Sequence, residues 1–345
     1  MKPLVSVIVP CRNEQAFIEG LLASILASDY PRLEVIVADG MSSDRSRDLL
    51  NQCASRDPRL RVIDNPERIT PVALNRAIAA STGEIVIRFD AHAVMPGDYV
   101  RRCVELLESS GAQNAGGSIR TLPQSQGPFS GPIVAALSSR FGVGNSAFRT
   151  SSSGTSGPGE TGPRQADTVF GGCWRREIFS RIGGFNEKLV RSQDIEFNLR
   201  LRRAGGKIVL DPGIVCDYYA RADLASFLAH SFSNGVWAVL PFAFSDIVSV
   251  RARHLIPLAF VTSLAVSIAL PFPWSIAAAA AYAAANLAAS AHIAITRRGS
   301  IYLALMPIAF LSLHLAYGLG SVWGFIKLAA QKPREASHFK TCKPH

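Results

Sequence analysis

Residues Val5–Glu14 read VSVIVPCRNE. β-Branched residues fill the first half of this stretch and polar residues follow at once, which is typical of a buried strand that ends at a sheet edge. Similar apolar runs recur as far as Phe89, and between them apolar residues repeat at three- and four-residue steps. This alternation predicts an α/β fold with a mostly parallel central sheet flanked by helices. The predicted strands are Val5–Val9, Glu34–Val37, Leu60–Ile63 and Ile85–Phe89, and the predicted helices are Glu14–Ala27, Asp44–Ala54 and Val72–Ala80.

A second half extends to about Ala220. It is predicted to contain a helix at Asp98–Glu108, a strand near Ala115–Ile119 and a helix at Asp194–Ala204 that ends at a glycine pair. Between them, Ser151–Pro163 reads SSSGTSGPGETGP and offers no apolar side chain to bury. We expect a mobile surface loop there, which is either a simple connector or a lid that closes over a substrate.

The composition excludes several classes of protein. With 345 residues, of which 48% are apolar, the chain has room for one sizeable core and an appendage. The six cysteines are scattered without metal-ligand spacing, which favours a reduced cytosolic compartment. The formal charge of +10 is concentrated beside apolar segments, which favours anionic membrane lipids as partners, and no aromatic and basic motif indicates nucleic acid.

The last hundred residues have the character of a membrane segment. An aromatic-rich amphipathic stretch, Leu224–Val239, precedes apolar runs at Leu255–Phe272, Trp274–Ile295 and Ile301–Ile326. Each run is about long enough to cross ~30 Å of hydrocarbon. Three crossings would leave the basic tail outside, against the positive-inside tendency, whereas two crossings with one interfacial or re-entrant run would not. The number of crossings therefore stays open between two and three.

Polar residues cluster where the first two predicted strands end. Pro10, Arg12 and Glu14 follow the first strand, at the usual ligand crevice of a parallel sheet. The second strand ends in ADGMSSD, so Asp39 reaches the same edge, where its carboxylate can accept hydrogen bonds from an imide N–H or from ribose hydroxyls. Asp44 is placed to cap the following helix. We expect a nucleotide at this edge.

The fourth strand ends in RFDAHA, which places Asp90 and His92 two residues apart. A carboxylate oxygen and an imidazole nitrogen suit Mn²⁺, and Mg²⁺ is tolerated when phosphate and water supply most of the ligands. In isolation such a triplet is more often a helix cap or a polar pair. Its position after a buried strand favours the metal site.

Two later motifs complete the candidate site. Gly171 and Gly172 precede Cys173 in FGGCWRREIF, which permits either close approach to a ligand or a tight turn. SQDIEFNLRLRRAGG places Gln193, Asp194 and Glu196 at the opening of a helix, where the helix dipole favours carboxylates. Helix capping alone would explain one of them.

In this order the motifs resemble the family 2 glycosyltransferases of the GT-A fold, and within them the succinoglycan glucosyltransferase group. The resemblance covers roughly Leu4 to Trp237, and a C-terminal membrane segment agrees with it. Its most specific parts are PCRNE, ADGMSSD, FDAHA, FGGCWRREIF and QDIEFN.

The resemblance implies a role for each candidate residue. Glu14 and Asp39 would hold the uridine of a UDP-sugar donor, with Pro10 and Arg12 beside them. Asp90 and His92 would engage its diphosphate through a divalent metal, Mg²⁺ or Mn²⁺. Asp194 would be the general base of an inverting displacement. The acceptor-binding residues would be Gly171, Gly172, Gln193 and Trp237.

Two departures from the family pattern stand out. Asp90-Ala91-His92 replaces Asp-x-Asp, and Gln193-Asp194 replaces Glu-Asp, with Glu196 as a second candidate for the base. Of the Gln-x-x-Arg-Trp motif of processive synthases, only Trp237 is matched, which disfavours a processive enzyme. Trp237 either stacks on an acceptor sugar or anchors the chain at the membrane interface.

The resemblance therefore implies a hexosyltransferase that moves glucose from UDP-glucose onto a polyprenyl-diphosphate-linked glycan of exopolysaccharide biosynthesis. A transferase acting directly on polyprenyl phosphate is the alternative, and a non-catalytic membrane scaffold is a third. We expect the inner (cytoplasmic) membrane as its location, with the catalytic domain facing the cytoplasm. The expected division is a catalytic domain at 1–222, an amphipathic interfacial segment at 223–253, membrane helices at 254–328 and a basic tail at 329–345.

Overall fold

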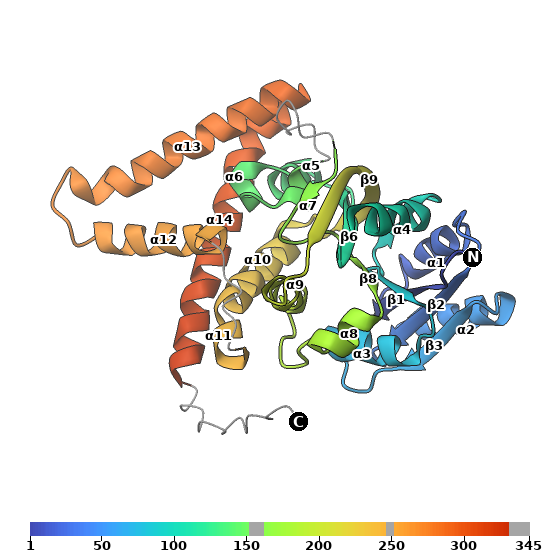
Figure 1. Cartoon of the computed structure of the whole chain (residues 1–345). Coiled ribbons are helices and arrows are strands. Elements are labelled where there is room, and N and C mark those ends of the chain that lie inside the picture. The colour runs from blue at the N-terminus through green and yellow to red at the C-terminus, as the bar shows by residue number, and fades with distance from the viewer. Residues whose placement is uncertain (152–161, 246–251, 331–345) are drawn as a thin grey trace, which may run out of the picture.

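The computed structural model of the chain describes residues 1–151, 162–245 and 252–330. Within these residues, strands form one mixed sheet in the order β3-β2-β1-β4-β8-β6-β9-β5, and β7 pairs with β9. Helices flank this sheet, and a group of long helices lies beside it (Figure 1). The strands are β1 (Val5–Cys11), β2 (Leu33–Asp39), β3 (Leu60–Asp64), β4 (Ile85–Arg88), β5 (Ala93–Val94), β6 (Asn114–Pro123), β7 (Arg164–Gln165), β8 (Cys173–Arg175) and β9 (Ile208–Ala220).

The first four strands confirm the predicted parallel half. β1 pairs in parallel with both β2 and β4, and β2 pairs in parallel with β3. The helices between them are α1 (Ile18–Leu26), α2 (Ser46–Arg56) and α3 (Thr70–Ala80). α1 starts four residues later than the predicted Glu14, because the N–H groups of Asn13 and Glu14 donate to the hydroxyl oxygens of Ser42 and Ser46. The chain between β1 and α1 is thereby tied to the loop after β2.

The second half makes the sheet mixed. β8 runs antiparallel between β4 and β6, whereas β6 and β9 are parallel. β5 pairs with β9 and sets Ala93 opposite Tyr218, so the segment after β4 lies against a strand from late in the chain. The helices of this half are α4 (Tyr99–Ser110), α5 (Ser130–Leu137), α6 (Arg140–Val143), α7 (Ala147–Thr150), α8 (Glu177–Ile182) and α9 (Gln193–Arg203).

Two apolar clusters sandwich the sheet, because alternate residues of each strand face opposite sides. Val7 and Val9 of β1 pack with α1 and α4 in one cluster. Ile8, between them, packs with α3, α8 and α9 in the other. Both faces of β1 are therefore buried, as its continuous apolar run predicts.

Most of the predicted glycine- and serine-rich loop at 151–163 lies outside the described residues, as does the basic tail after Ala330. The expected lid or connector role of that loop thus stays a prediction.

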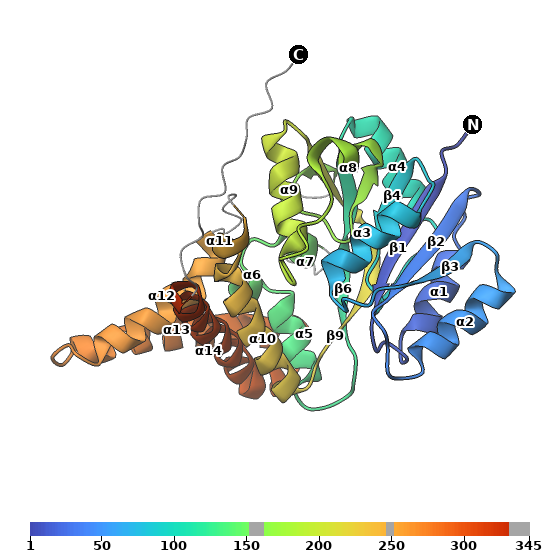
Figure 2. The ribbon, with the colours of Figure 1, turned by 90° about the horizontal axis from the view of Figure 1, so that it is seen from below.

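The C-terminal part consists of long helices on the side of the molecule away from β1, β2 and β3, as Figure 2 shows. By length and hydropathy α13 and α14 are long and apolar enough to cross a membrane, whereas α12 is shorter. Its 16 residues span about 24 Å, less than the ~30 Å of a hydrocarbon core. The helices are α10 (Leu224–Val239), α11 (Pro241–Phe244), α12 (Ala252–Ser267), α13 (Trp274–Arg297) and α14 (Ser300–Ala330).

Helices α10 and α14 pack backbone against backbone through glycines. A Cβ atom on Gly235 would overlap the carbonyl oxygen of Tyr317, and one on Gly320 would overlap that of Phe232. Ser321 Oγ donates a hydrogen bond to the carbonyl oxygen of Gly235 at 3.3 Å. Glycine permits this close approach, which joins the helix after the sheet directly to the last apolar helix.

Candidate active site

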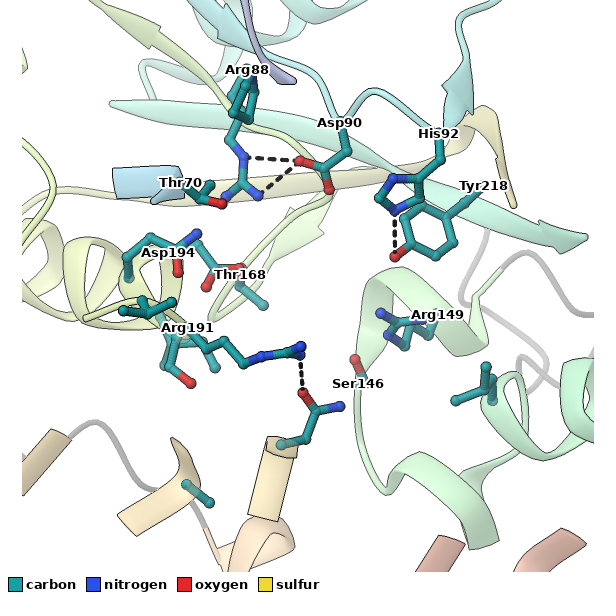
Figure 3. Close-up of a pocket in the computed structure, with 18 of the residues that line it drawn as sticks. Thr70, Arg88, Asp90, His92, Ser146, Arg149, Thr168, Arg191, Asp194 and Tyr218 are labelled. Carbon is teal, nitrogen blue, oxygen red and sulfur yellow. Dashed lines mark hydrogen bonds and ion pairs between the residues drawn. The ribbon is translucent and has the colours of Figure 1, made fainter. Parts of the chain in front are cut away.

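A cavity of about 610 Å³ lies beside the ends of β1 and β4. Its walls come from the sheet edge, from the α6 and α7 segment, from the start of α9 and from α10, α12 and α14 (Figure 3). It brings together seven of the residues predicted from the sequence: Pro10, Arg12, Glu14, Asp90, His92, Gln193 and Asp194.

Arg88 holds Asp90 at the end of β4. Its Nε and Nη2 atoms lie 3.2 and 2.8 Å from the same carboxylate oxygen, Oδ1 (Figure 3). Burial alone would raise the pKa of Asp90, but the charges of Arg88 and His92 outweigh it and lower the pKa. Asp90 is therefore ionised, and no described residue donates a hydrogen bond to its second oxygen.

His92 is held from both sides of its ring. Nδ1 lies 3.2 Å from Oε1 of Glu14, and Nε2 lies 3.0 Å from the hydroxyl oxygen of Tyr218. Burial lowers the pKa of His92, but Tyr218, Glu14 and Asp90 outweigh it and raise the pKa to about 10. A charged ring donates from both nitrogens, so His92 connects the end of β1 to β9.

Of the predicted metal pair, Asp90 fits a divalent metal better than His92. Its second carboxylate oxygen is the kind of ligand that Mg²⁺ and Mn²⁺ prefer. Both nitrogens of His92 have protein partners in this arrangement. In the described part of the chain, no group of three or more His, Cys, Asp or Glu side chains is arranged to hold a metal. A metal at Asp90 would therefore take most of its ligands from phosphate and water.

Asp39 lies next to the cavity without lining it. Its side chain is 1% exposed and accepts hydrogen bonds from the Ser42 hydroxyl at 2.5 Å and from Arg47 at 3.4 Å. The neighbouring Gly40 does line the cavity, as does Asn65, whose N–H donates to the Asp39 carbonyl at 2.8 Å. Asn65 Oδ1 is buried and has no hydrogen-bond partner in the described structure. It is an acceptor that a ligand can satisfy.

Asp194 and Glu196 point in different directions, although both belong to the first turn of α9. Residues two apart on a helix are separated by about 200° around its axis. Asp194 lines the cavity. Glu196 is 3% exposed and binds Arg200 with Oε1 at 2.7 Å and Oε2 at 2.9 Å. Of the two predicted candidates for the base, Asp194 alone faces the cavity.

The remaining predicted acceptor residues do not line the cavity. Gly171 and Gly172 have φ angles of 66° and 102°, and a Cβ on either would overlap the Arg88 carbonyl oxygen or the Trp174 ring. These contacts match the tight turn that was the alternative interpretation of the pair. Trp237 is half-buried, accepts a hydrogen bond from Ser192 at its carbonyl oxygen and has its ring centroid 6.5 Å from that of Phe244.

The long apolar helices form one wall of the same cavity. His314 of α14 connects this wall to its surroundings, with Nε2 3.1 Å from the carbonyl oxygen of Phe141 and Nδ1 3.0 Å from the hydroxyl oxygen of Tyr282. The residues that α12 and α14 contribute are Arg253, His254, Pro257, Leu313, His314 and Tyr317.

Sequence reasoning missed Arg149, Arg191 and Tyr218, which all line the cavity. Arg191 carried a weak signal, because it lies two residues before the Gln193-Asp194 motif. Tyr218 carried none, since only the pairing of β5 with β9 brings it to His92. Arg149 precedes the glycine- and serine-rich stretch and belongs to no motif.

Three comparisons with known proteins, by family model, by sequence and by structure, agree with one another. The family model described as Glycosyl transferase family 2 matches residues 6–182. The succinoglycan biosynthesis protein ExoA of Rhizobium meliloti (strain 1021) is 30% identical over 333 residues, which cover 91% of this chain and 92% of that protein.

A second relative is the dolichyl N-acetyl-α-D-glucosaminyl phosphate 3-β-D-2,3-diacetamido-2,3-dideoxy-β-D-glucuronosyltransferase of Methanococcus voltae. It is 26% identical over 241 residues, which cover 67% of this chain and 71% of that protein. Among solved structures, the mannosyltransferase PcManGT from Pyrobaculum calidifontis, in complex with GDP-Man and Mn²⁺, superposes with a TM-score of 0.57 at 22% identity. The match covers 94% of this chain and 88% of the mannosyltransferase, and it shows a shared fold.

Proposed function

Because this chain belongs to glycosyl transferase family 2, we propose that it is an inverting enzyme that moves glucose from UDP-glucose onto a polyprenyl-diphosphate-linked glycan. The chain is a glycosyltransferase with the GT-A fold. One structural observation supports the acceptor side of this proposal. A single cavity is lined by Asp90 after β4 and Asp194 of α9 and, on another wall, by residues of the apolar helices α12 and α14.

The proposed reaction is a single displacement. Asp194 takes the proton of an acceptor hydroxyl while that oxygen attacks the anomeric carbon of the donor. The bond from the anomeric carbon to the diphosphate oxygen breaks, the nucleoside diphosphate leaves with the bonding electrons, and the configuration inverts. Asp90 would hold Mg²⁺ or Mn²⁺, which would supply positive charge to the leaving diphosphate.

The donor site is proposed at the ends of β1 and β2. Pro10, Arg12 and Glu14 line the cavity there, and the unsatisfied oxygen of Asn65 offers an acceptor to the N–H of a base. Asp39 would then support the donor site without touching the donor, since its hydrogen bonds with Ser42 and Arg47 hold the loop after β2. The Mn²⁺ and GDP-Man in the structurally similar mannosyltransferase support a nucleotide sugar and a divalent metal as ligands.

Two observations support a lipid-linked acceptor. Residues of α12 and α14 line the same cavity as Asp194, which suits an acceptor that is anchored in a bilayer. The names of the two relatives describe succinoglycan biosynthesis and transfer to a dolichyl-linked sugar. Gln193, which lines the cavity beside Asp194, is the predicted acceptor contact that best fits this arrangement.

We place the catalytic part, 1–222, on the cytoplasmic side of the inner membrane. The five cysteines of the described residues are free, as expected of a reducing compartment. With α13 and α14 crossing and α12 at the interface, the chain crosses twice, so the basic tail returns to the cytoplasmic side. Residues 223–253 then form the interfacial segment, and 254–328 the membrane-associated helices.

A transferase that acts directly on polyprenyl phosphate is the second candidate, because the same wall would receive a lipid phosphate. A decisive experiment uses membranes that contain the full-length protein. They are incubated with UDP-glucose, UDP-galactose, UDP-N-acetylglucosamine or GDP-mannose, each radiolabelled. The acceptor is either a lipid extract rich in polyprenyl-diphosphate glycans or pure undecaprenyl phosphate.

The proposal expects one labelled lipid from UDP-glucose with the glycan extract, in which the new linkage is β. Label on pure undecaprenyl phosphate would establish the second candidate instead. A third outcome is that no donor gives transfer, although the purified protein binds UDP. That result would overturn both candidate transferases and favour the non-catalytic scaffold. The matched control is the Asp194→Asn variant at equal expression.

A further inference from the structure

The cavity carries more positive than negative charge. Of its arginines, Arg88 is paired with Asp90, and Arg253 is paired with Asp167 at 3.1 Å. Others face the cavity without a carboxylate partner among the described residues, and a phosphorylated ligand would neutralise them. The charged residues that line it are the six arginines Arg12, Arg68, Arg88, Arg149, Arg191 and Arg253, the protonated His92 and the three acids Glu14, Asp90 and Asp194.

Arg191 projects into the cavity from the segment before α9. Its Nη1 lies 2.9 Å from Oδ1 of Asn234 on α10, and no carboxylate of the described residues forms an ion pair with it. Burial and the nearby charge of Arg221 lower the pKa of Arg191, which reflects positive charge without a partner. Asn234 precedes Gly235, which packs on α14, so Arg191 lies toward the membrane helices.

Arg149 projects from α7 on the opposite wall. Its guanidinium carbon lies 5.6 Å from the Tyr218 ring centroid and 5.2 Å from that of Phe148, and no described carboxylate forms an ion pair with it. Figure 3 shows the guanidinium groups of Arg149 and Arg191 directed toward the same space from opposite sides. His230 adds no positive charge here, because burial and Arg191 lower its pKa to about 3 and keep it neutral.

We propose that Arg149 and Arg191 bind the diphosphate of the lipid-linked acceptor, between Asp194 and the wall formed by α12 and α14. This inference rests on the proposed function and adds the subsite that holds the acceptor. Two guanidinium groups facing each other suit a diphosphate, because each can donate parallel hydrogen bonds to phosphate oxygens. The donor diphosphate is a different source of the same chemistry, and Asp90 at the strand end would engage it through a divalent metal.

A binding experiment distinguishes the acceptor diphosphate from the donor diphosphate as the ligand of the two arginines. It uses the full-length protein in nanodiscs of phosphatidylethanolamine and phosphatidylglycerol. Farnesyl diphosphate serves as the acceptor probe, measured with the donor side saturated by UDP and Mg²⁺, and UDP itself serves as the donor probe. We expect Arg149→Gln and Arg191→Gln each to weaken farnesyl diphosphate binding about 10- to 100-fold, because each substitution removes a charge-assisted hydrogen bond. UDP affinity should change less than about twofold, and lysine at either position should restore part of the loss.

The control is Arg203→Gln, which removes an exposed arginine of α9 outside the cavity and should change neither affinity. Weakened UDP binding in the two variants, with farnesyl diphosphate binding unchanged, would assign the arginines to the donor and overturn the proposal. Unchanged binding of both probes, or no farnesyl diphosphate binding by the native protein, would overturn it as well. Failure of sugar transfer to all lipid acceptors would refute the proposed function separately, because the binding assay requires no turnover.

Discussion

The hydroxyl oxygen of Tyr218 lies 3.0 Å from Nε2 of His92, although 126 residues separate them in the chain. The two rings also meet edge to face, with centroids 4.9 Å apart. Through the other nitrogen of His92, this contact extends to Glu14 at the end of the first strand. Three segments that would form the donor and metal side of the cavity are thus held together by one imidazole.

Tyr218→Phe tests that connection. The substitution keeps the ring beneath Arg149 but removes the hydroxyl, which typically contributes about 0.5–1.5 kcal/mol. We expect a lower unfolding temperature and a fall in transfer of up to about tenfold, measured with purified membranes. Tyr219→Phe is the matched control on the same strand, because its ring packs on Phe17 and no described residue bonds its hydroxyl. Equal effects of the two substitutions would contradict a special role for the His92 contact.

Asp194→Asn tests the general base. The amide keeps the size of the side chain but cannot take the acceptor proton, so turnover should fall by about two to four orders of magnitude. UDP binding, measured by calorimetry, should stay within about twofold of the native value. Asp48→Asn, which changes an exposed acid of α2, is the control and should be neutral. Native turnover in the Asp194→Asn variant would exclude this residue as the base.

Metal removal, combined with substitutions, should distinguish the role of Asp90 in metal binding from that of His92. Chelation with EDTA should abolish transfer, and added Mn²⁺ or Mg²⁺ should restore it. Asp90→Asn removes the oxygen that faces the cavity and should lower turnover at least about 100-fold at any metal concentration. His92→Gln should leave the metal concentration for half-maximal activity nearly unchanged, because both His92 nitrogens already have protein partners. A large shift of that concentration in His92→Gln would instead identify His92 as a ligand.

Gly235→Ala tests the packing of α10 on α14. The added methyl would meet the carbonyl oxygen of Tyr317, and such overpacking costs typically about 1–3 kcal/mol. We expect a lower unfolding temperature and weaker transfer, because the cavity wall moves with α14. Gly20→Ala in α1 is the control, since no atom lies within 4 Å of the new Cβ. An unchanged unfolding temperature in Gly235→Ala would show that the two helices do not pack this closely.

The pH dependence of stability should show the contribution of His230. Its pKa is about 3 in the folded protein and about 6.5 in the unfolded chain, so only the unfolded chain takes up this proton as the pH falls below 6.5. Stability is therefore lost progressively from pH 6.5 toward pH 4, and no loss from this group occurs above pH 7. In His230→Gln the unfolding temperature should fall less steeply across that window. Identical slopes for the two proteins would contradict the shifted pKa.

The parallel half of the fold was predictable because β1, β2 and β4 are buried on both faces and read as short apolar runs. The predicted strand Val5–Val9 falls within β1, and the predicted Trp274–Ile295 lies within α13. The mixed pairing of β8 was not predictable, since the three residues Cys173–Arg175 carry no signal of their direction. The late start of α1 depends on hydrogen bonds from another loop, which local propensity does not contain.

The candidate site was predictable where polar residues directly follow strands, as at Glu14 and Asp90. It was not predictable where tertiary structure supplies the residue, as with Arg149 and Tyr218. Gly171 and Gly172 show a different limit of prediction from sequence. Their sequence context suits a ligand and a tight turn equally well, and only the overlap with Arg88 and Trp174 distinguishes the two.

The wall formed by α12 and α14 has a consequence for how this enzyme can be divided or recombined. The end of the chain completes a chamber whose opposite side is formed by its first strand. Anchor and catalyst are therefore not interchangeable modules. A chimera that carries foreign C-terminal helices would retain the sheet side of the cavity but lose the wall that α12 and α14 contribute.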